Sequence, residues 1–188
     1  MDVLELATEL HGHLAPGVAL GVRMSEIALE RLGTKRGNKR LIGVSETRRC
    51  LADALQATTG CTLGHGNAMV KDYGKLAITV GRVDSKKGVR VSLKKDAYRL
   101  SPLMREWMMR GRKLKRSEEE ELAHQLSKLD EKFLKIEDVI IDLEQEFEST
   151  AIKKCDECGE LVPEIFILER EGKAICKVCG GEGYYKTI

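Results

Sequence analysis

The spacing of hydrophobic positions along the first hundred residues switches between a helical and a strand-like period. Residues 18–32 carry polar side chains on one stripe only, which predicts a mostly buried helix. Pro16 suits the first turn of this helix and Gly33 suits its end. Residues 18–32 are therefore predicted to form a helix that packs against a core.

Strand-like runs follow that helix. Residues 41–45 are predicted to form a strand and residues 49–58 a second helix. Residues 75–83 and 89–93 read as two strands joined by a polar turn, which predicts a hairpin. Helices combined with a hairpin indicate an α+β fold for an N-terminal domain over residues 1–115.

Beyond residue 121, apolar residues recur at alternating steps of four and three. They are Leu122, Leu126, Leu129, Phe133, Ile136, Ile140, Leu143 and Phe147. This stripe predicts a helical segment over residues 116–149, as one long helix or two in register. Leu134 and Ile141 widen the stripe, which favours packing on a globular body over a free coiled coil. The alternative is a dimer helix, and we expect a homodimer that buries Phe133 and Ile140.

A basic cluster at residues 110–116 directly precedes the acidic run 118–121. Acidic side chains are favourable in the first turn of a helix. The pattern therefore indicates a solvated loop and a helix start.

Two C-x2-C pairs lie in the last part of the chain, Cys155 with Cys158 and Cys176 with Cys179. A two-residue gap lets one tight turn aim two sulfurs at one ion, and two such turns complete a tetrahedron. A redox C-x-x-C pair is the alternative, but it leaves the second pair unexplained. We predict a zinc ribbon over residues 150–188 that holds a structural zinc ion, because all four ligand positions are filled.

Composition and charge narrow the classes of function. The 188 residues are 42% hydrophobic and 33% charged, with 32 basic and 30 acidic side chains. This near-neutral balance, with only 4% aromatic residues, disfavours a nucleic-acid binder. The N-terminus does not read as a signal peptide and no apolar run could span a bilayer. We expect a cytoplasmic protein without a membrane partner, whose paired cysteines bind metal.

Histidine and cysteine also gather near the N-terminus. These residues are His11, His13, Cys50, Cys61 and His65. Gly12 permits a turn that could aim His11 and His13 at one metal, and Cys50 shares a helix face with Asp53. Each residue also has an ordinary explanation as a buried or hydrogen-bonded side chain, so spacing alone leaves a shared metal or catalytic site and a structural role both open.

Three stretches of the chain resemble the FmdE family of formylmethanofuran dehydrogenase proteins. They are HGHLAPGVALGVRMSEIALERLG, ETRRCLADALQATTGCTLGHGNAMVKDYGKLAITV and CDECGELVPE. The resemblance implies an α+β protein with a zinc ribbon and a pocket built from the first two motifs. The pocket residues that it implies are His11, His13, Cys50, Asp53 and Cys61, with Asn67 and Lys75 nearby.

Two positions depart from the family pattern. Ala15 stands where the H-G-H-x-C-P-G motif has cysteine, and His65 stands where lysine is frequent. Losing a thiolate removes a soft ligand or a redox partner for Cys61, whereas an added imidazole could partly replace it.

The resemblance leads to two hypotheses of function. In the first, the chain is an FmdE-like metal-binding protein, an accessory subunit or relative of the tungsten or molybdenum formylmethanofuran dehydrogenase system. His11, His13 and Cys61 then hold a transition metal, and Asp53 and Cys61 are candidate catalytic residues. In the second, the chain is a non-enzymatic zinc-ribbon adaptor or assembly protein for a redox-enzyme partner.

Overall fold

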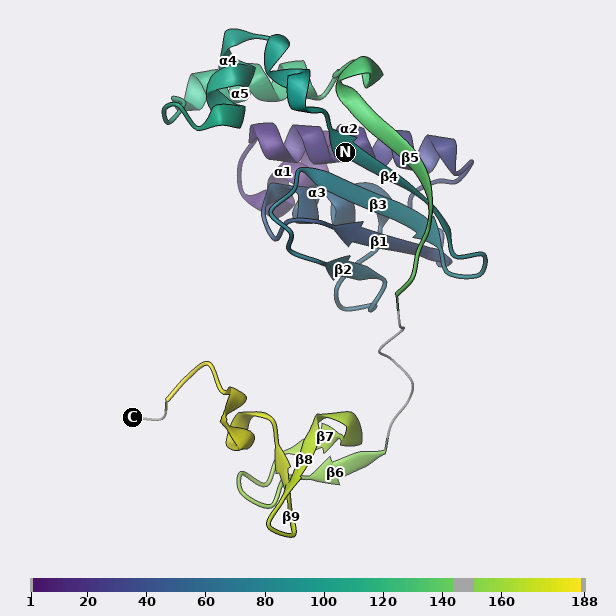
Figure 1. The fold of residues 1–188 in the computed structure, drawn as a ribbon, viewed down its shortest axis with the longest axis vertical. Coiled ribbons are helices and arrows are strands. Elements are labelled where there is room, and N and C mark those ends of the chain that lie inside the picture. Colours follow the sequence, from purple (N-terminus) through teal and green to yellow (C-terminus); the bar gives the residue numbers. More distant parts are fainter. Residues whose placement is uncertain (1, 144–150, 187–188) are drawn as a thin grey trace. The chain divides into compact units, whose positions relative to one another are not determined.

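A computed structural model describes residues 2–143 and 151–186 of the chain. The chain divides into two compact units, Met1–Asp142 and Leu143–Ile188 (Figure 1). The predicted boundary between residues 115 and 116 therefore falls inside the first unit, and that between 149 and 150 lies outside the described residues.

The first unit combines five α-helices with a five-stranded sheet in its described part. The helices are α1 (Val3–His11), α2 (Pro16–Arg31), α3 (Cys50–Thr59), α4 (Pro102–Met109) and α5 (Arg116–Leu126). The strands are β1 (Leu41–Ser45), β2 (Ala68–Val70), β3 (Ala77–Arg82), β4 (Lys87–Leu93) and β5 (Leu134–Ile140). Short 3-10 turns cover Lys95–Arg99 and Glu131–Phe133. The predicted α+β class is confirmed.

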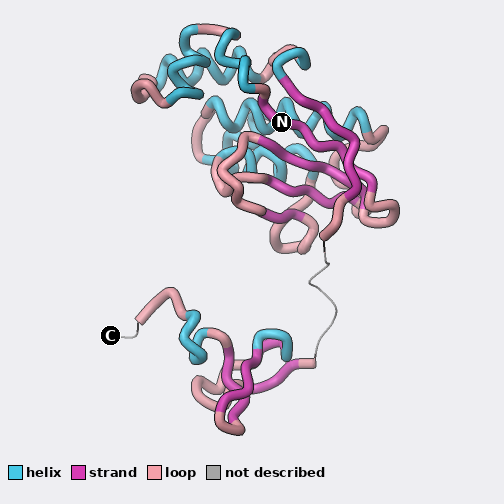
Figure 2. Tube along the Cα trace, in the orientation of Figure 1, coloured by secondary structure: helices cyan, strands magenta, loops and turns pink. Residues whose placement is uncertain are grey.

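The sheet has the strand order β2-β1-β3-β4-β5. β1 and β2 are parallel and α3 connects them, whereas the other neighbouring strands are antiparallel. The helices α1, α2 and α3 lie together along the sheet, as Figures 1 and 2 show. Because both parallel strands run in one direction, their carboxyl ends reach the same edge of the sheet, close to the start of α3.

Close packing of α2 on α3 depends on two glycines. A Cβ atom at Gly17 would lie 2.9 Å from the Cys50 Cβ, and one at Gly21 would lie 2.6 Å from the Ala54 Cβ. Neither distance leaves room for a side chain. The glycines therefore set how closely the two helices approach and bring both N-termini to one side of the domain.

The long helix predicted from the heptad stripe is wrong. The helix α5 ends at Leu126, and residues 134–140 form strand β5, which pairs with β4. Asp130 explains the break, because its carboxylate accepts a hydrogen bond from the Lys132 N–H and begins a 3-10 turn. The β-branched residues that follow favour a strand, and β4 offers an unpaired edge to it.

The stripe residues have different environments in the described structure. Leu122, Leu126 and Leu129 are buried in the main core, whereas Ile140 is 68% exposed. The last stripe residue, Phe147, lies outside the described residues. The homodimer prediction rested on a continuous helix face and loses that support.

The C-terminal unit consists of two short hairpins in its described part. They pair β6 (Ile152–Lys154) with β7 (Leu161–Pro163), and β8 (Ile167–Arg170) with β9 (Lys173–Cys176). A 3-10 turn at Glu164–Phe166 precedes β8, and a helical turn at Val178–Glu182 follows β9. The β8–β9 hairpin turns at Glu171 and Gly172, with positive φ angles at both residues.

No helix in the described part of the chain combines the length and the apolar content needed to cross a bilayer.

We expect Gly21→Val to destabilise the first unit by about 3 kcal/mol, because the new side chain would force α2 away from Leu51 and Ala54. Gly64→Val is the matched control, since nothing lies within 4 Å of a Cβ at that loop position, and its effect should stay within about 0.5 kcal/mol. Urea unfolding followed by the fluorescence of Trp107, the sole tryptophan, measures both. Equal stability of the two variants would contradict the packing argument.

Candidate functional site

Four cysteines meet in the C-terminal unit. The Sγ atoms of Cys155, Cys158, Cys176 and Cys179 all lie within 4.8 Å of one another. Among the described residues, no other group of three or more histidine, cysteine or acidic side chains gathers in this way. The structure therefore contains one preformed four-thiol cluster that could hold a metal ion.

Backbone N–H groups donate hydrogen bonds to the sulfurs of this cluster and favour the thiolate form that binds a cation. The N–H of Cys176 donates to the Cys155 Sγ at 3.3 Å, and the N–H of Cys179 donates to the Cys176 Sγ at 3.5 Å. Hydrogen bonds from the backbone of Cys158 and Cys176 lower the pKa of Cys155 to about 6. The neighbouring Cys176 thiol instead raises the pKa of Cys179. The four sulfurs can all be ionised together only when a cation offsets their mutual repulsion.

The spacing of the sulfurs fits a tetrahedral ion. A zinc ion with Zn–S bonds of about 2.3 Å requires sulfurs about 3.8 Å apart. The Cys158 and Cys176 sulfurs lie 3.9 Å apart. Besides cysteines, the apolar cluster of this unit holds only Val162, Leu168 and Ile175 in the described structure. A bound metal would therefore supply much of the folding free energy of the unit.

A second group of polar residues lies where α1 ends beside the first turn of α3. The Nδ1 atom of His11 lies 2.8 Å from an Asp53 carboxylate oxygen. The rings of His11 and His13 are 5.0 Å apart. When Nδ1 of His11 donates this hydrogen bond to the Asp53 carboxylate, Nε2 of His11 is free to accept a hydrogen bond or to bind a metal.

Cys61 does not join these histidines. It follows the C-terminal end of α3, whereas His11 contacts the N-terminal turn, and a helix of this length spans about 15 Å. Its side chain is 1% exposed within the main hydrophobic core, and burial raises the pKa of the thiol. The structure therefore gives Cys61 the surroundings of a core residue.

The remaining residues of the second motif hold their own loop together. Asn67 accepts a hydrogen bond from the Thr62 N–H and donates one to the Leu41 carbonyl. His65 contacts the Thr62 hydroxyl at 2.8 Å, and Lys75 is exposed. The first family stretch thus meets the start of α3, whereas residues 61–67 of the second stretch lie beyond its C-terminal end.

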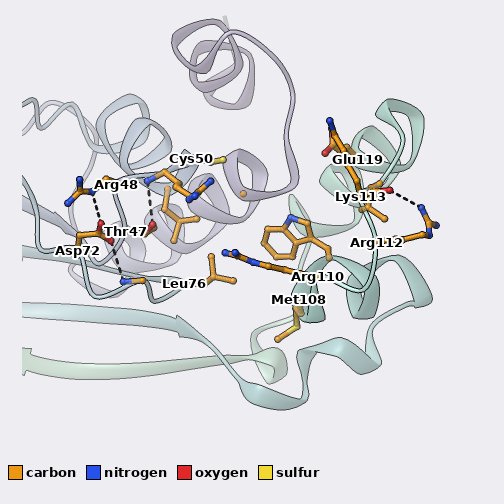
Figure 3. A pocket seen from close by; sticks show the side chains of 16 residues that line it. Thr47, Arg48, Cys50, Asp72, Leu76, Met108, Arg110, Arg112, Lys113 and Glu119 are labelled. Carbon is orange, nitrogen blue, oxygen red and sulfur yellow. Dashed lines mark hydrogen bonds and ion pairs between the residues drawn. The ribbon is translucent and has the colours of Figure 1, made fainter.

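A cavity of about 980 Å³ opens beside the start of α3 (Figure 3). One wall comes from residues 47–51 and from the loop that joins β2 to β3. The other wall comes from the end of α4, the following loop and Glu119 of α5. Gly17 and Cys50 line the cavity where the N-termini of α2 and α3 meet.

The lining of this cavity is rich in positive charge. Five lining residues are cationic and two are acidic. They are Arg48, Arg49, Arg110, Arg112 and Lys113, with Asp72 and Glu119. The basic cluster at residues 110–116, which we interpreted from sequence as a solvated loop, thus supplies most of one charged wall. The basic cluster lines the cavity because its loop folds back toward α3. Local sequence patterns do not predict this long-range contact.

The fold and the thiol cluster define an α+β protein with a C-terminal four-cysteine cluster that could hold a metal ion. A family model described as "FmdE, Molybdenum formylmethanofuran dehydrogenase operon" matches residues 10–141. The chain therefore belongs to the FmdE family.

Two relatives extend this comparison. A tungsten formylmethanofuran dehydrogenase FmdE-like protein from Syntrophus aciditrophicus has a crystal structure that matches with a TM-score of 0.78 and 27% identity. This match covers 97% of the present chain and 92% of the other. A protein of Archaeoglobus fulgidus named "Probable S-adenosyl-L-methionine-binding protein" is 36% identical over 200 residues. That match covers 97% of the present chain but only 53% of the relative, so the chain spans about half the relative's length.

We expect Cys50 to react slowly with iodoacetamide at neutral pH. Burial raises the pKa of its thiol, so the reactive thiolate forms only at higher pH. The alkylation rate should therefore reach half of its maximum only above about pH 8.5, the pKa of a free cysteine.

Mass spectrometry of the zinc-loaded protein measures this rate. Cys50→Ala is the control, because buried Cys61 should remain unlabelled. A half-maximal rate at or below about pH 8.5 would contradict a raised pKa for Cys50.

Proposed function

We propose that this FmdE-family protein holds one structural zinc ion in its C-terminal unit and a second transition-metal ion beside His11 and His13. We further propose that it serves as an accessory subunit, or as a relative of one, in a tungsten or molybdenum formylmethanofuran dehydrogenase system. The observation that carries the proposal is the four-cysteine cluster, whose sulfur spacing suits tetrahedral zinc.

The contact between His11 and Asp53 supports the second metal site. Histidine ligands in metal sites usually donate their other ring N–H to a carboxylate, which fixes the ring and raises its basicity. The Nδ1 of His11 has this relation to Asp53 at 2.8 Å. With His13 as the second ligand, at least two coordination positions stay open, which suits an exchangeable ion better than a structural one.

This version of the pocket differs from the one expected from sequence. His11 and His13 are retained as ligands, Asp53 orients His11, and Cys61 is left out because it is buried in the core. A catalytic role of Asp53 would be exercised through His11 and not on a substrate directly.

Similarity supports the link to the dehydrogenase system. The matched family model and the Syntrophus relative both carry formylmethanofuran dehydrogenase in their names. The name of the Archaeoglobus relative suggests S-adenosyl-L-methionine instead, but that protein is about twice as long as the matched region. The sulfonium cation of this ligand is also poorly matched to a cavity with five cationic side chains. We therefore do not propose that this chain binds S-adenosyl-L-methionine.

An adaptor without a second metal is the alternative. Exposed apolar residues on the C-terminal unit favour it, among them Leu161, which is 71% exposed, Ile165 and Phe166. In this alternative the unit docks on a redox-enzyme partner and binds zinc alone.

Metal content distinguishes the two candidates. We expect two metal equivalents per chain in the wild type, measured by elemental analysis after exchange into metal-buffered solution. Cys176→Ser should lose the structural zinc and unfold the C-terminal unit, while Trp107 fluorescence shows the first unit still folded. A variant with full zinc content would refute the four-cysteine site.

The second site has its own matched variants. His11→Ala combined with His13→Ala should lose one equivalent, and Asp53→Asn should weaken the same site by about 10–100-fold. His124→Ala is the control, because this histidine is exposed on α5. One equivalent in the wild type, unchanged in the histidine variants, would favour the adaptor.

A further inference from the structure

The cavity beside Cys50 has more positive charge than its own acidic residues neutralise. Arg48 pairs with Asp72 at 2.6 Å, and Arg112 holds Glu118 through two contacts of 2.7 and 2.8 Å. Within residues 2–143 and 151–186, the lining residues Arg49, Arg110 and Lys113 have no ion-pair partner. These three cations come from both walls of the cavity.

The backbone adds to this positive field. The helices α2 and α3 both begin at the cavity, and neither first turn donates a backbone hydrogen bond to the side chain of its N-cap residue. Helix N-termini carry partial positive charge and free N–H groups, which favour phosphate and other anions. The carboxyl end of β1 leads into α3 here, an arrangement in which α/β proteins commonly bind ligands.

The rest of the lining is apolar. Leu76, Trp107, Met108 and Leu114 contribute to the wall. Figure 3 shows Arg110 extending into the space between Leu76 and the α4 segment. A volume of about 980 Å³ lies at the upper end of the range for small-molecule sites and far exceeds the needs of a single phosphate ion.

We infer that this cavity binds a phosphorylated small molecule of the nucleotide class. Its phosphates face Arg49, Arg110 and Lys113 near the two helix N-termini, and its flat ring lies against the apolar wall that includes Trp107. The thiol of Cys50 lies at the floor of the site, beside Gly17. The inference is separate from metal binding, because none of these residues belongs to either metal site.

Titration of the full-length, zinc-loaded protein with adenosine, guanosine, cytidine and uridine diphosphates tests the inference. Calorimetry gives the affinity, and Trp107 fluorescence reports the place of binding, because the chain has no second tryptophan. We expect at least one nucleotide to bind with a Kd of about 100 μM or tighter, to perturb Trp107 and to weaken as salt is added.

Fragments of the ligand separate its two parts. Inorganic pyrophosphate and the free nucleoside should each bind at least about tenfold more weakly than the best diphosphate. If pyrophosphate binds as tightly as the best diphosphate, the ring contributes nothing and the nucleotide class is wrong. If the nucleoside binds as tightly, the phosphates contribute nothing and the proposed phosphate site is wrong. Failure of all four nucleotides to bind would overturn the inference as a whole.

Matched variants locate the phosphates. Arg49→Ala and Arg110→Asn should each weaken the best nucleotide by about tenfold, since each removes a charged hydrogen-bond donor. Asparagine is chosen because residue 110 has a positive φ of 50°. Arg105→Ala is the control, since Arg105 is exposed on α4 and does not line the cavity, and it should bind as the wild type does.

Circular dichroism shows whether each variant is folded. If one arginine variant does not fold, the other still tests the phosphate site. Full affinity in both folded arginine variants would overturn the inference. Metal content should be the same in all of these proteins, so loss of nucleotide binding and loss of the proposed metal function are distinguishable.

Discussion

The contact between α2 and α3 is the constraint on which the cavity side of the first unit depends. Gly17 and Gly21 allow the two helices to touch at Cys50, Leu51 and Ala54. Because the contact runs from the first turns of both helices, it fixes both N-termini at the edge where β1 and β2 end. The cavity, its backbone donors and the thiol of Cys50 all occupy positions that this one packing arrangement sets.

The two ends of α3 have different surroundings, although both belong to stretches that resemble the FmdE family. The first turn of α3 carries Asp53, which orients His11, and its C-terminal end leads into the loop of Cys61 and Asn67. The first end is polar and partly open, whereas the second is closed by core packing and by the Asn67 hydrogen bonds. Within one chain, the proposed metal site lies at the first end of α3, and the hydrogen bonds at the second end stabilise a loop.

The two units are stabilised in different ways. The first buries a large apolar core between the sheet and its helices, so it has no need of an ion to fold. The second has few apolar residues besides its cysteines, and the four sulfurs occupy the place of a core. A metal ion held by the four thiols would therefore contribute directly to the folding of the C-terminal unit, whereas the N-terminal unit folds on its apolar core.

The sequence by itself determined the features that depend on neighbouring residues. The helix that begins at Pro16, the β3–β4 hairpin and the two C-x2-C pairs follow from local spacing and turn chemistry, and all are present. Tertiary structure decided the features that depend on distant contacts. The run from Leu134 to Ile140 fits a helical stripe as well as a strand, and the unpaired edge of β4 selected the strand. The convergence of His11 with Asp53, the burial of Cys61 and the return of Arg110 toward α3 likewise required the packed fold, because sequence spacing does not state which end of a helix a distant side chain will meet.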